Sequence, residues 1–134
     1  MSEPPSLQEW YGHGSDSFVQ RQAQGALLAG ARHLKRGEYF VAYTSWQRAE
    51  AAVGGSEARR IRGLVHLAAA GVKHLDGDVR GAERQLLRAR TRLEQGSPAL
   101  LNVDVDALVL LIEELVMPNR GATAAGDSPP GRGG

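Results

Sequence analysis

Apolar residues recur at spacings of three and four along most of this chain, and no segment of useful length alternates between apolar and polar residues. The clearest run consists of Ile61, Leu64, Val65, Ala68, Val72 and Leu75. Spacings of three and four place side chains on one face of an α-helix, whereas a strand with one buried face needs a period of two. The sequence therefore predicts an all-α fold with no β-sheet.

Residues that cap or break helices divide this pattern into five segments. The helices that we expect span residues 17–36, 38–53, 56–75, 79–94 and 104–117. Asp16 and Asp78 are the expected N-caps of the first and fourth helices, and Gly37 suits the left-handed position after a helix end. The expected apolar stripes of the first, fourth and fifth helices are Val19, Ala23, Ala26, Leu27 and Leu34; Val79, Ala82, Leu86, Ala89 and Leu93; and Leu108, Leu111, Ile112 and Leu115. Because the first two helices, and likewise the third and fourth, have very short links, each pair should form an antiparallel hairpin.

The two expected hairpins resemble each other in sequence. Residues 29–34 read Ala-Gly-Ala-Arg-His-Leu, and residues 70–75 read Ala-Gly-Val-Lys-His-Leu. After each hexapeptide come a link of two or one residues, a glycine and then an acidic residue. The matches at an offset of 40 are Ala42, Trp46 and Ala49 with Ala82, Leu86 and Ala89. We infer two stacked copies of one hairpin, closed by the C-terminal helix. Since two copies are few for an open repeat array, we expect a compact bundle of five helices.

The 134 residues fit one domain, which we place at residues 16–117. Residues 1–15 and 118–134 contain too few apolar side chains to offset the entropy lost on ordering, so they are predicted to be a flexible N-terminal segment and a disordered C-terminal tail. Trp10 and Tyr11 are the exception. They either fold back onto the bundle, which we favour, or stay exposed as a contact point.

Composition excludes several classes of protein. With no cysteine, the chain has neither a disulfide nor a thiolate metal site. Its first residues do not read as a signal peptide, and no apolar stretch is long enough to cross a bilayer. A net charge of +1 gives no overall attraction to nucleic acid or to an anionic membrane. We therefore expect a cytoplasmic protein with no membrane partner.

Several motifs occur together in the middle of the chain. Residues 62–70 read Arg-Gly-Leu-Val-His-Leu-Ala-Ala-Ala, His74 follows, and residues 77–82 read Gly-Asp-Val-Arg-Gly-Ala. Residues 37–40 upstream read Gly-Glu-Tyr-Phe, and residues 102–105 downstream read Asn-Val-Asp-Val. In order and spacing, these motifs resemble the small bacterial domain-of-unknown-function family 309, over about residues 24–116. The resemblance implies a compact all-α bundle of about five helices and brings no established biochemical activity.

The resemblance breaks where that family carries its ionisable cluster. After Tyr-Phe, its members typically have His-Glu and then a second Glu three residues later, groups that suit metal binding or proton transfer. The matching positions here hold Tyr43, Thr44 and Gln47, and on the third helix Arg62 and His66 stand where the family has Gln. We expect these five residues to form either a degenerate pocket for a small anion or polar ligand, or a buried polar network that fixes helix packing.

Arg80, Arg84, Arg88 and Arg92 recur every four residues along the fourth expected helix. Together with basic residues of the third helix, this arginine row could bind phosphate groups. The glutamates between them and the small net charge favour a solvated face instead. The four acidic residues of the fifth helix would complement the row, within one chain or across a dimer.

The four histidines are His13, His33, His66 and His74, and no His-Glu-x-x-His motif is present. His33 and His74 lie at expected helix ends, where the helix dipole favours an imidazolium. His74 with Asp76 and Asp78 is a weaker alternative, a loose metal site. No Ser or Thr has a partner His and acid, so we predict no catalytic residue, cofactor or metal.

These features favour a non-enzymatic interaction or scaffold module, because stacked hairpins offer helix faces and grooves to a protein partner or a second copy. Two alternatives stay open. One is a small-ligand-binding or metal-binding protein, or an enzyme, that uses a pocket between the second and third helices. The other is a nucleic-acid accessory protein that uses the arginine row, although we do not expect a nucleic-acid partner.

Overall fold

The computed structural model describes residues 7–96, 98, 101 and 103–118 of the chain, with side chains from Phe18 onward. The helices in this part are α1 (Leu7–Lys35), α2 (Tyr39–Ala52), α3 (Gly55–Leu75), α4 (Val79–Leu93) and α5 (Val105–Val116). No strand occurs among the described residues, so the predicted all-α class is confirmed. Residues 1–6 and 119–134, which belong to the two predicted flexible ends, lie outside the described part.

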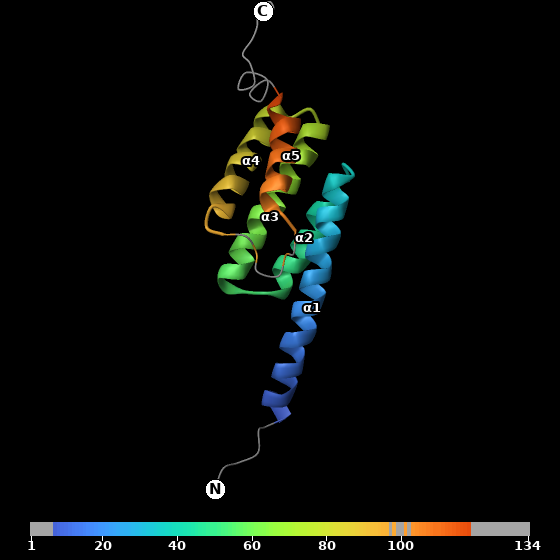
Figure 1. Ribbon diagram of the computed structural model, residues 1–134, viewed down its shortest axis with the longest axis vertical. Coiled ribbons are helices and arrows are strands. Elements are labelled where there is room, and N and C mark those ends of the chain that lie inside the picture. Colours follow the sequence, from blue (N-terminus) through green and yellow to red (C-terminus); the bar gives the residue numbers. More distant parts are fainter. Residues whose placement is uncertain (1–6, 97, 99–100, 102, 119–134) are drawn as a thin grey trace, which may run out of the picture.

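The helices run up and down in chain order as two hairpins and a closing helix (Figure 1). The most extensive contacts join α1 to α2, α2 to α3 and α3 to α4, so that α2 and α4 flank α3. The fifth helix packs on α3 and α4 and also reaches α1. This is the predicted bundle of two stacked hairpins with a C-terminal closing helix. In this arrangement, one side of α3 faces outward between α2 and α4.

The predicted start of α1 is wrong. This helix begins at Leu7 rather than Ser17, so Asp16 lies inside it and does not cap its start. Glycines such as Gly12 and Gly14 each cost a helix about 1 kcal/mol relative to alanine, and adding a residue to an existing helix is far easier than nucleating one. The side chains of Trp10 and Tyr11 lie outside the described part. Although α1 and α3 are long, no helix of the described part combines the length and apolar character needed to cross a membrane.

The two hairpins have the same turn geometry at an offset of 40 residues. The Glu38 N–H donates to the His33 carbonyl and the Asp78 N–H to the Lys73 carbonyl, each at 2.9 Å. Gly37 and Gly77 both have φ of 80°, a left-handed conformation that glycine adopts without a steric penalty. The predicted role of Gly37 is therefore confirmed.

Burial follows the same offset of 40 and corrects one part of the sequence repeat. The buried pairs at this offset are Ala23 with Gly63, Leu27 with Leu67, Gly30 with Ala70, Ala31 with Gly71, Ala42 with Ala82, Trp46 with Leu86 and Ala49 with Ala89. The two hexapeptides match at an offset of 41, one residue out of this register. Leu34 is fully buried, whereas Leu75, its partner in the hexapeptide match, is 67% exposed, and His74, its partner at the offset of 40, is exposed too. The link between the hexapeptide and the turn glycine is longer in the first hairpin than in the second, which accounts for the difference between the offsets of 41 and 40.

Trp46 is the largest fully buried side chain and locks α2 onto α1. Its Nε1–H donates to the Leu27 carbonyl at 2.9 Å, which satisfies the polar atom of the indole inside the core. The ring lies against Gly30, where an added Cβ would collide with three of its atoms. Glycine at residue 30 is therefore what lets the indole approach the α1 backbone. The other large, fully buried side chains include Leu27, Leu34, Ile61, Leu64, Leu67, Leu86, Leu108 and Ile112.

Three residues expected in the core are exposed. Leu75 and Val79, 60% exposed, flank the turn at the tip of the α3–α4 hairpin, where the hairpin ends. Leu111 is 37% exposed because the buried face of α5 is made by Val105, Leu108, Ile112 and Val116. Spacing alone did not show which edge of a broad apolar stripe would be covered.

The helix-cap predictions are confirmed at Asp78. Its Oδ1 accepts from the Gly81 N–H at 2.8 Å, while Oδ2 lies 3.9 Å from Lys73 Nζ. These contacts engage the carboxylate that the alternative metal site with His74 would need. His33, at the corresponding end of α1, pairs through Nδ1 with Glu38 Oε1 at 2.7 Å.

We expect Gly30→Ala to destabilise the protein by about 1–3 kcal/mol, because the added methyl group overpacks the Trp46 ring. The matched control is Gly25→Ala, also inside α1, where an added Cβ meets nothing within 4 Å. This control should stabilise the protein by up to about 1 kcal/mol through helix propensity. Urea unfolding followed by circular dichroism measures both. Equal effects of the two changes would contradict the close packing of Trp46 on α1.

Candidate functional site

The side of α3 that lies between α2 and α4 forms the floor of a groove. Arg62, His66, Ala69 and Lys73 follow one another on α3 at spacings of four, three and four, which places them on one helix face. Side chains of α2 and α4 stand on either side of this row and enclose two neighbouring hollows. We call these hollows together the α3 groove.

One end of the α3 groove is a basic hollow of about 550 Å³. It is lined by Glu50 of α2, by Ala58, Arg59, Arg62 and His66 of α3, and by Arg88 and Arg92 of α4. Four guanidinium groups thus surround one carboxylate. At neutral pH, with His66 uncharged, the lining carries a net charge of about +3 from these groups.

The other end is an aromatic hollow of about 410 Å³. It is lined by Phe40 and Tyr43 of α2, by Arg62, His66, Ala69, Val72 and Lys73 of α3, and by Gln85 of α4. The rings of Phe40 and Tyr43 stack with centroids 6.1 Å apart and 23° between their planes. Phe40 is 64% exposed, so its apolar surface is available to a bound group. Arg62 and His66 line both hollows and mark the border between them.

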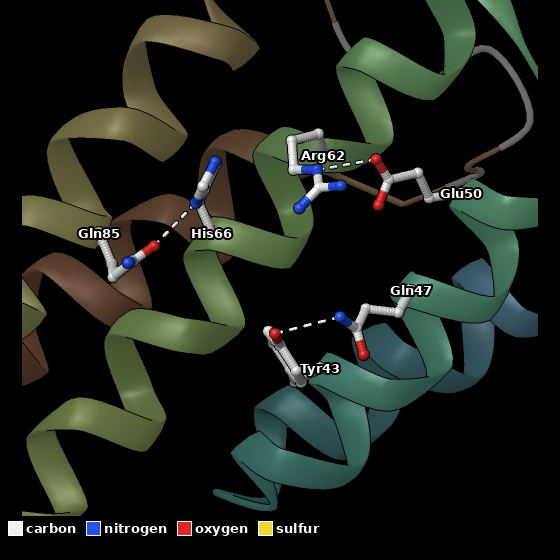
Figure 2. A network of polar contacts seen from close by, with 6 residues as sticks. All are labelled: Tyr43, Gln47, Glu50, Arg62, His66 and Gln85. Carbon is white, nitrogen blue, oxygen red and sulfur yellow. Dashed lines mark hydrogen bonds and ion pairs between the residues drawn. The ribbon is translucent and has the colours of Figure 1, made fainter.

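Two polar contacts tie the floor of the groove to its walls (Figure 2). Arg62 Nε donates to Glu50 Oε2 at 2.7 Å, which joins α3 to α2. His66 Nδ1 lies 2.7 Å from Gln85 Oε1, which joins α3 to α4. Because Gln85 presents a carbonyl oxygen here, the imidazole donates from Nδ1 and leaves Nε2 as its second polar atom. Each contact fixes a side chain that borders both hollows.

The five residues predicted as a degenerate pocket divide into two groups. Tyr43, Arg62 and His66 meet at the aromatic hollow. Gln47 is connected to them only through Tyr43, whose hydroxyl accepts from Gln47 Nε2 at 3.1 Å within α2. Thr44 lines neither hollow, and its hydroxyl donates to the Val41 carbonyl of its own helix at 3.0 Å. The structure therefore brings three of the five together on one side of α3.

The predicted arginine row also divides. Arg88 and Arg92 line the basic hollow, whereas Arg80 and Arg84 of the same helix line neither hollow of the groove. The acidic residues of α5 were expected to complement this arginine row, but Glu113 pairs with an arginine outside it: its Oε2 lies 3.1 Å from Arg90 Nη1. Arg90 points to α5, while Arg88 and Arg92 face the groove.

Sequence reasoning did not assign Glu50, Gln85 or Phe40 to the site. Glu50 supplies a carboxylate one turn after Gln47, and it lies 12 residues from Arg62 in the chain. Gln85 lies 19 residues from His66. Neither pair follows from a helical spacing, because each depends on how one helix stacks on the next. Phe40 was part of the motif Gly-Glu-Tyr-Phe, and its exposure gave no signal in the sequence.

Burial lowers the pKa of His66 below its ordinary value of 6.5. The hydrogen bond to Gln85 raises that pKa, and the positive charges of Arg62, Arg92 and Arg88 lower it again. The imidazole is therefore neutral at pH 7. A negative charge placed beside the arginines around it would favour the protonated form.

The chemistry available in the groove is recognition of negative charge beside an apolar surface. Glu50 is held by Arg62, so it is not a free carboxylate. Among the described residues, no three side chains of His, Asp or Glu come together in a way that could hold a metal ion. No protein-family model, curated protein or solved structure matches this chain.

We expect the lowered pKa of His66 to make folding stability depend on pH. In the unfolded chain this imidazole takes up a proton near pH 6.5, whereas in the folded protein it does so only at a lower pH. The unfolded state therefore binds more protons in this window. The stability present above pH 6.5 is lost as the pH falls toward the folded-state pKa.

Urea unfolding between pH 5 and pH 8 measures this dependence. His66→Gln should flatten the loss of stability below pH 6.5, while His74→Gln, at an exposed residue of the same helix, should leave it unchanged. An equal slope in the wild type and the His66→Gln variant would show that His66 is not held neutral by its surroundings.

Proposed function

We propose that this protein is a cytoplasmic, non-enzymatic interaction module that binds a segment of a partner protein in the α3 groove. The observation that carries the proposal is the pairing of two different surfaces along one helix face. The basic hollow offers Arg59, Arg88 and Arg92, and the aromatic hollow offers the stacked rings of Phe40 and Tyr43. A groove between packed helices is a common seat for a helical or extended segment.

Charge and polarity define the chemistry of the partner segment. The net positive lining at one end favours acidic side chains, and the exposed ring of Phe40 at the other favours a large apolar side chain. Arginine and aromatic residues are also the types that contribute most binding energy in protein interfaces. The expected occupant is therefore a segment that carries acidic residues on one side of an apolar anchor.

We also propose that the chain is a divergent relative of the bacterial domain-of-unknown-function family 309. The support is the order of the motifs around residues 37–40, 62–82 and 102–105. At the positions of that family's ionisable cluster stand Tyr43, Thr44 and Gln47. Replacing ionisable side chains by neutral ones accords with a surface that binds and does not transfer protons.

The proposal is tested by selecting peptides from a displayed random library against the immobilised full-length protein. We expect enrichment of peptides that combine acidic residues with a large apolar residue. Phe40→Ser should weaken binding of the selected peptides at least about tenfold, as expected for loss of an aromatic anchor. The measurement is peptide affinity by fluorescence anisotropy.

Leu87→Ser is the matched control. Leu87 is 65% exposed, nearly the same as Phe40 at 64%, but it lies on α4 and lines neither hollow of the groove. Binding by this variant should stay within about twofold of the wild type, the range of ordinary surface substitutions. No enrichment of acidic–apolar peptides, or equal losses in both variants, would overturn the proposal.

A further inference from the structure

We propose that the basic hollow is a binding site for a doubly charged phosphate group, either inorganic phosphate or the phosphoryl group of a phosphate monoester. The inference does not depend on whether a protein segment occupies the α3 groove. It stands on the number of unpaired guanidinium groups, on their placement around one hollow, and on the chemistry of the side chains next to it.

The hollow holds more positive charge than the protein itself neutralises. Arg59, Arg88 and Arg92 have no hydrogen bond or ion pair with any residue in the described part of the chain. Arg62 is the one guanidinium of the four that the structure pairs, through Nε with Glu50 Oε2 at 2.7 Å among the described residues. Among the described residues, Glu50 is the only acidic one that lines the hollow. A single carboxylate ligand would leave most of this charge unbalanced, whereas a dianion matches it more closely.

The geometry presents these groups from two sides. Arg59 and Arg62 rise from α3, and Arg88 and Arg92 come from the facing side of α4. Planar guanidinium groups bind phosphate oxygens in pairs, so groups from two helices can contact different oxygens of one tetrahedral anion. A hollow of about 550 Å³ lies within the range of small-molecule sites and has room for a phosphate with an attached organic group.

His66 completes the site as a group that responds to the anion. It lies next to Arg62, Arg88 and Arg92, whose charges disfavour protonation of the imidazole. Besides these arginines and Arg59, the charged or titratable groups that line the two hollows it borders are Glu50, Tyr43 and Lys73. A bound dianion reverses the local balance, so protonation of His66 becomes easier when the site is filled.

The neighbouring aromatic hollow distinguishes the two sources of the phosphate group. Because Arg62 and His66 line both hollows, a phosphoryl group held by the arginines can place an attached ring beside Phe40 and Tyr43. Inorganic phosphate has nothing to place there. Tighter binding of phenyl phosphate than of inorganic phosphate, with the gain lost in Phe40→Ser, identifies a monoester site. Equal binding of the two identifies a site for the free anion, and either result supports the proposal.

The experiment titrates the full-length protein with inorganic phosphate, and separately with phenyl phosphate, at constant ionic strength set by chloride. The imidazole resonances of His66, assigned with His66→Gln, report binding. Arg88→Gln or Arg92→Gln should raise the dissociation constant at least about tenfold, the usual effect of losing a charge-assisted contact. Arg84→Gln, which removes the same charge from the same helix outside the hollow, should change it less than about twofold.

Glu50→Gln should increase the affinity for phosphate, an effect that damage to the fold does not produce. It removes the one negative charge lining the hollow, so phosphate should bind more tightly than in the wild type. A pH series with sulfate, which stays doubly charged throughout, should show a higher pKa for His66 in the presence of the anion and tighter binding as the pH falls.

The proposal is overturned if neither phosphate nor phenyl phosphate shifts the His66 resonances beyond the chloride control. It is also overturned if Arg84→Gln weakens binding as much as Arg88→Gln, since the attraction would then come from the whole arginine row. Tighter binding of a single-stranded oligonucleotide than of phenyl phosphate, with equal dependence on Arg80, Arg84 and Arg88, would replace it with a nucleic-acid surface.

Discussion

The seating of Trp46 against α1 is the constraint on which the rest of the bundle depends. The indole is fully buried, donates to the Leu27 carbonyl, and touches the α1 backbone where Gly30 has no side chain. These contacts fix both the distance between α1 and α2 and the rotation of α2 about its axis. In the orientation that these contacts give α2, the side chains of Phe40, Tyr43 and Glu50 lie on the side of the groove along α3. The wall of the groove is thus a consequence of packing on the adjacent face of the same helix, since Tyr43 and Glu50 lie three and four residues from Trp46.

The hairpin repeat explains why α3 and α5 are each held by an ion pair to the helix before them. Glu50 of α2 pairs with Arg62 of α3, and Arg90 of α4 pairs with Glu113 of α5. Glu50 and Arg90 stand at the offset of 40 that relates the two hairpins, so the same place in each copy contacts the next helix with opposite charge. Partly exposed pairs of this kind add little stability. Their consequence here is positional: Arg90 lies two residues from Arg88 and from Arg92, so it contacts α5 from the other side of α4 and leaves those two facing the groove.

The sequence predicted the fold better than it predicted the site, for a physical reason. Helix ends from Gly37 to Pro118 fall within about one residue of expectation because glycine, proline and capping aspartates act locally. The start of α1 was missed since Gly12 and Gly14 weaken a helix without ending it. In the site, Arg62 and His66 share a face that helical spacing reveals, but their partners Glu50 and Gln85 come from other helices. The hexapeptide repeat is one residue out of register for the same reason. Sequence identity does not show which residues meet across a pair of helices, whereas the hydrogen bonds of the turns and the pattern of burial do.

The two hollows of the α3 groove cannot act independently, because Arg62 and His66 belong to both. A neutral His66 keeps the border between them weakly polar, which suits an apolar group beside Phe40. A negative charge at the arginines favours the protonated imidazole and so changes the surface that the second hollow offers. Linkage makes this effect reciprocal: whatever stabilises the charged form of His66 from the aromatic side also favours an anion on the basic side. The hydrogen bond to Gln85 holds the ring in the position where both influences reach it. Loss of Trp46 packing would loosen α2, which carries Phe40, Tyr43 and Glu50, so the core of the first hairpin governs the shape of the groove.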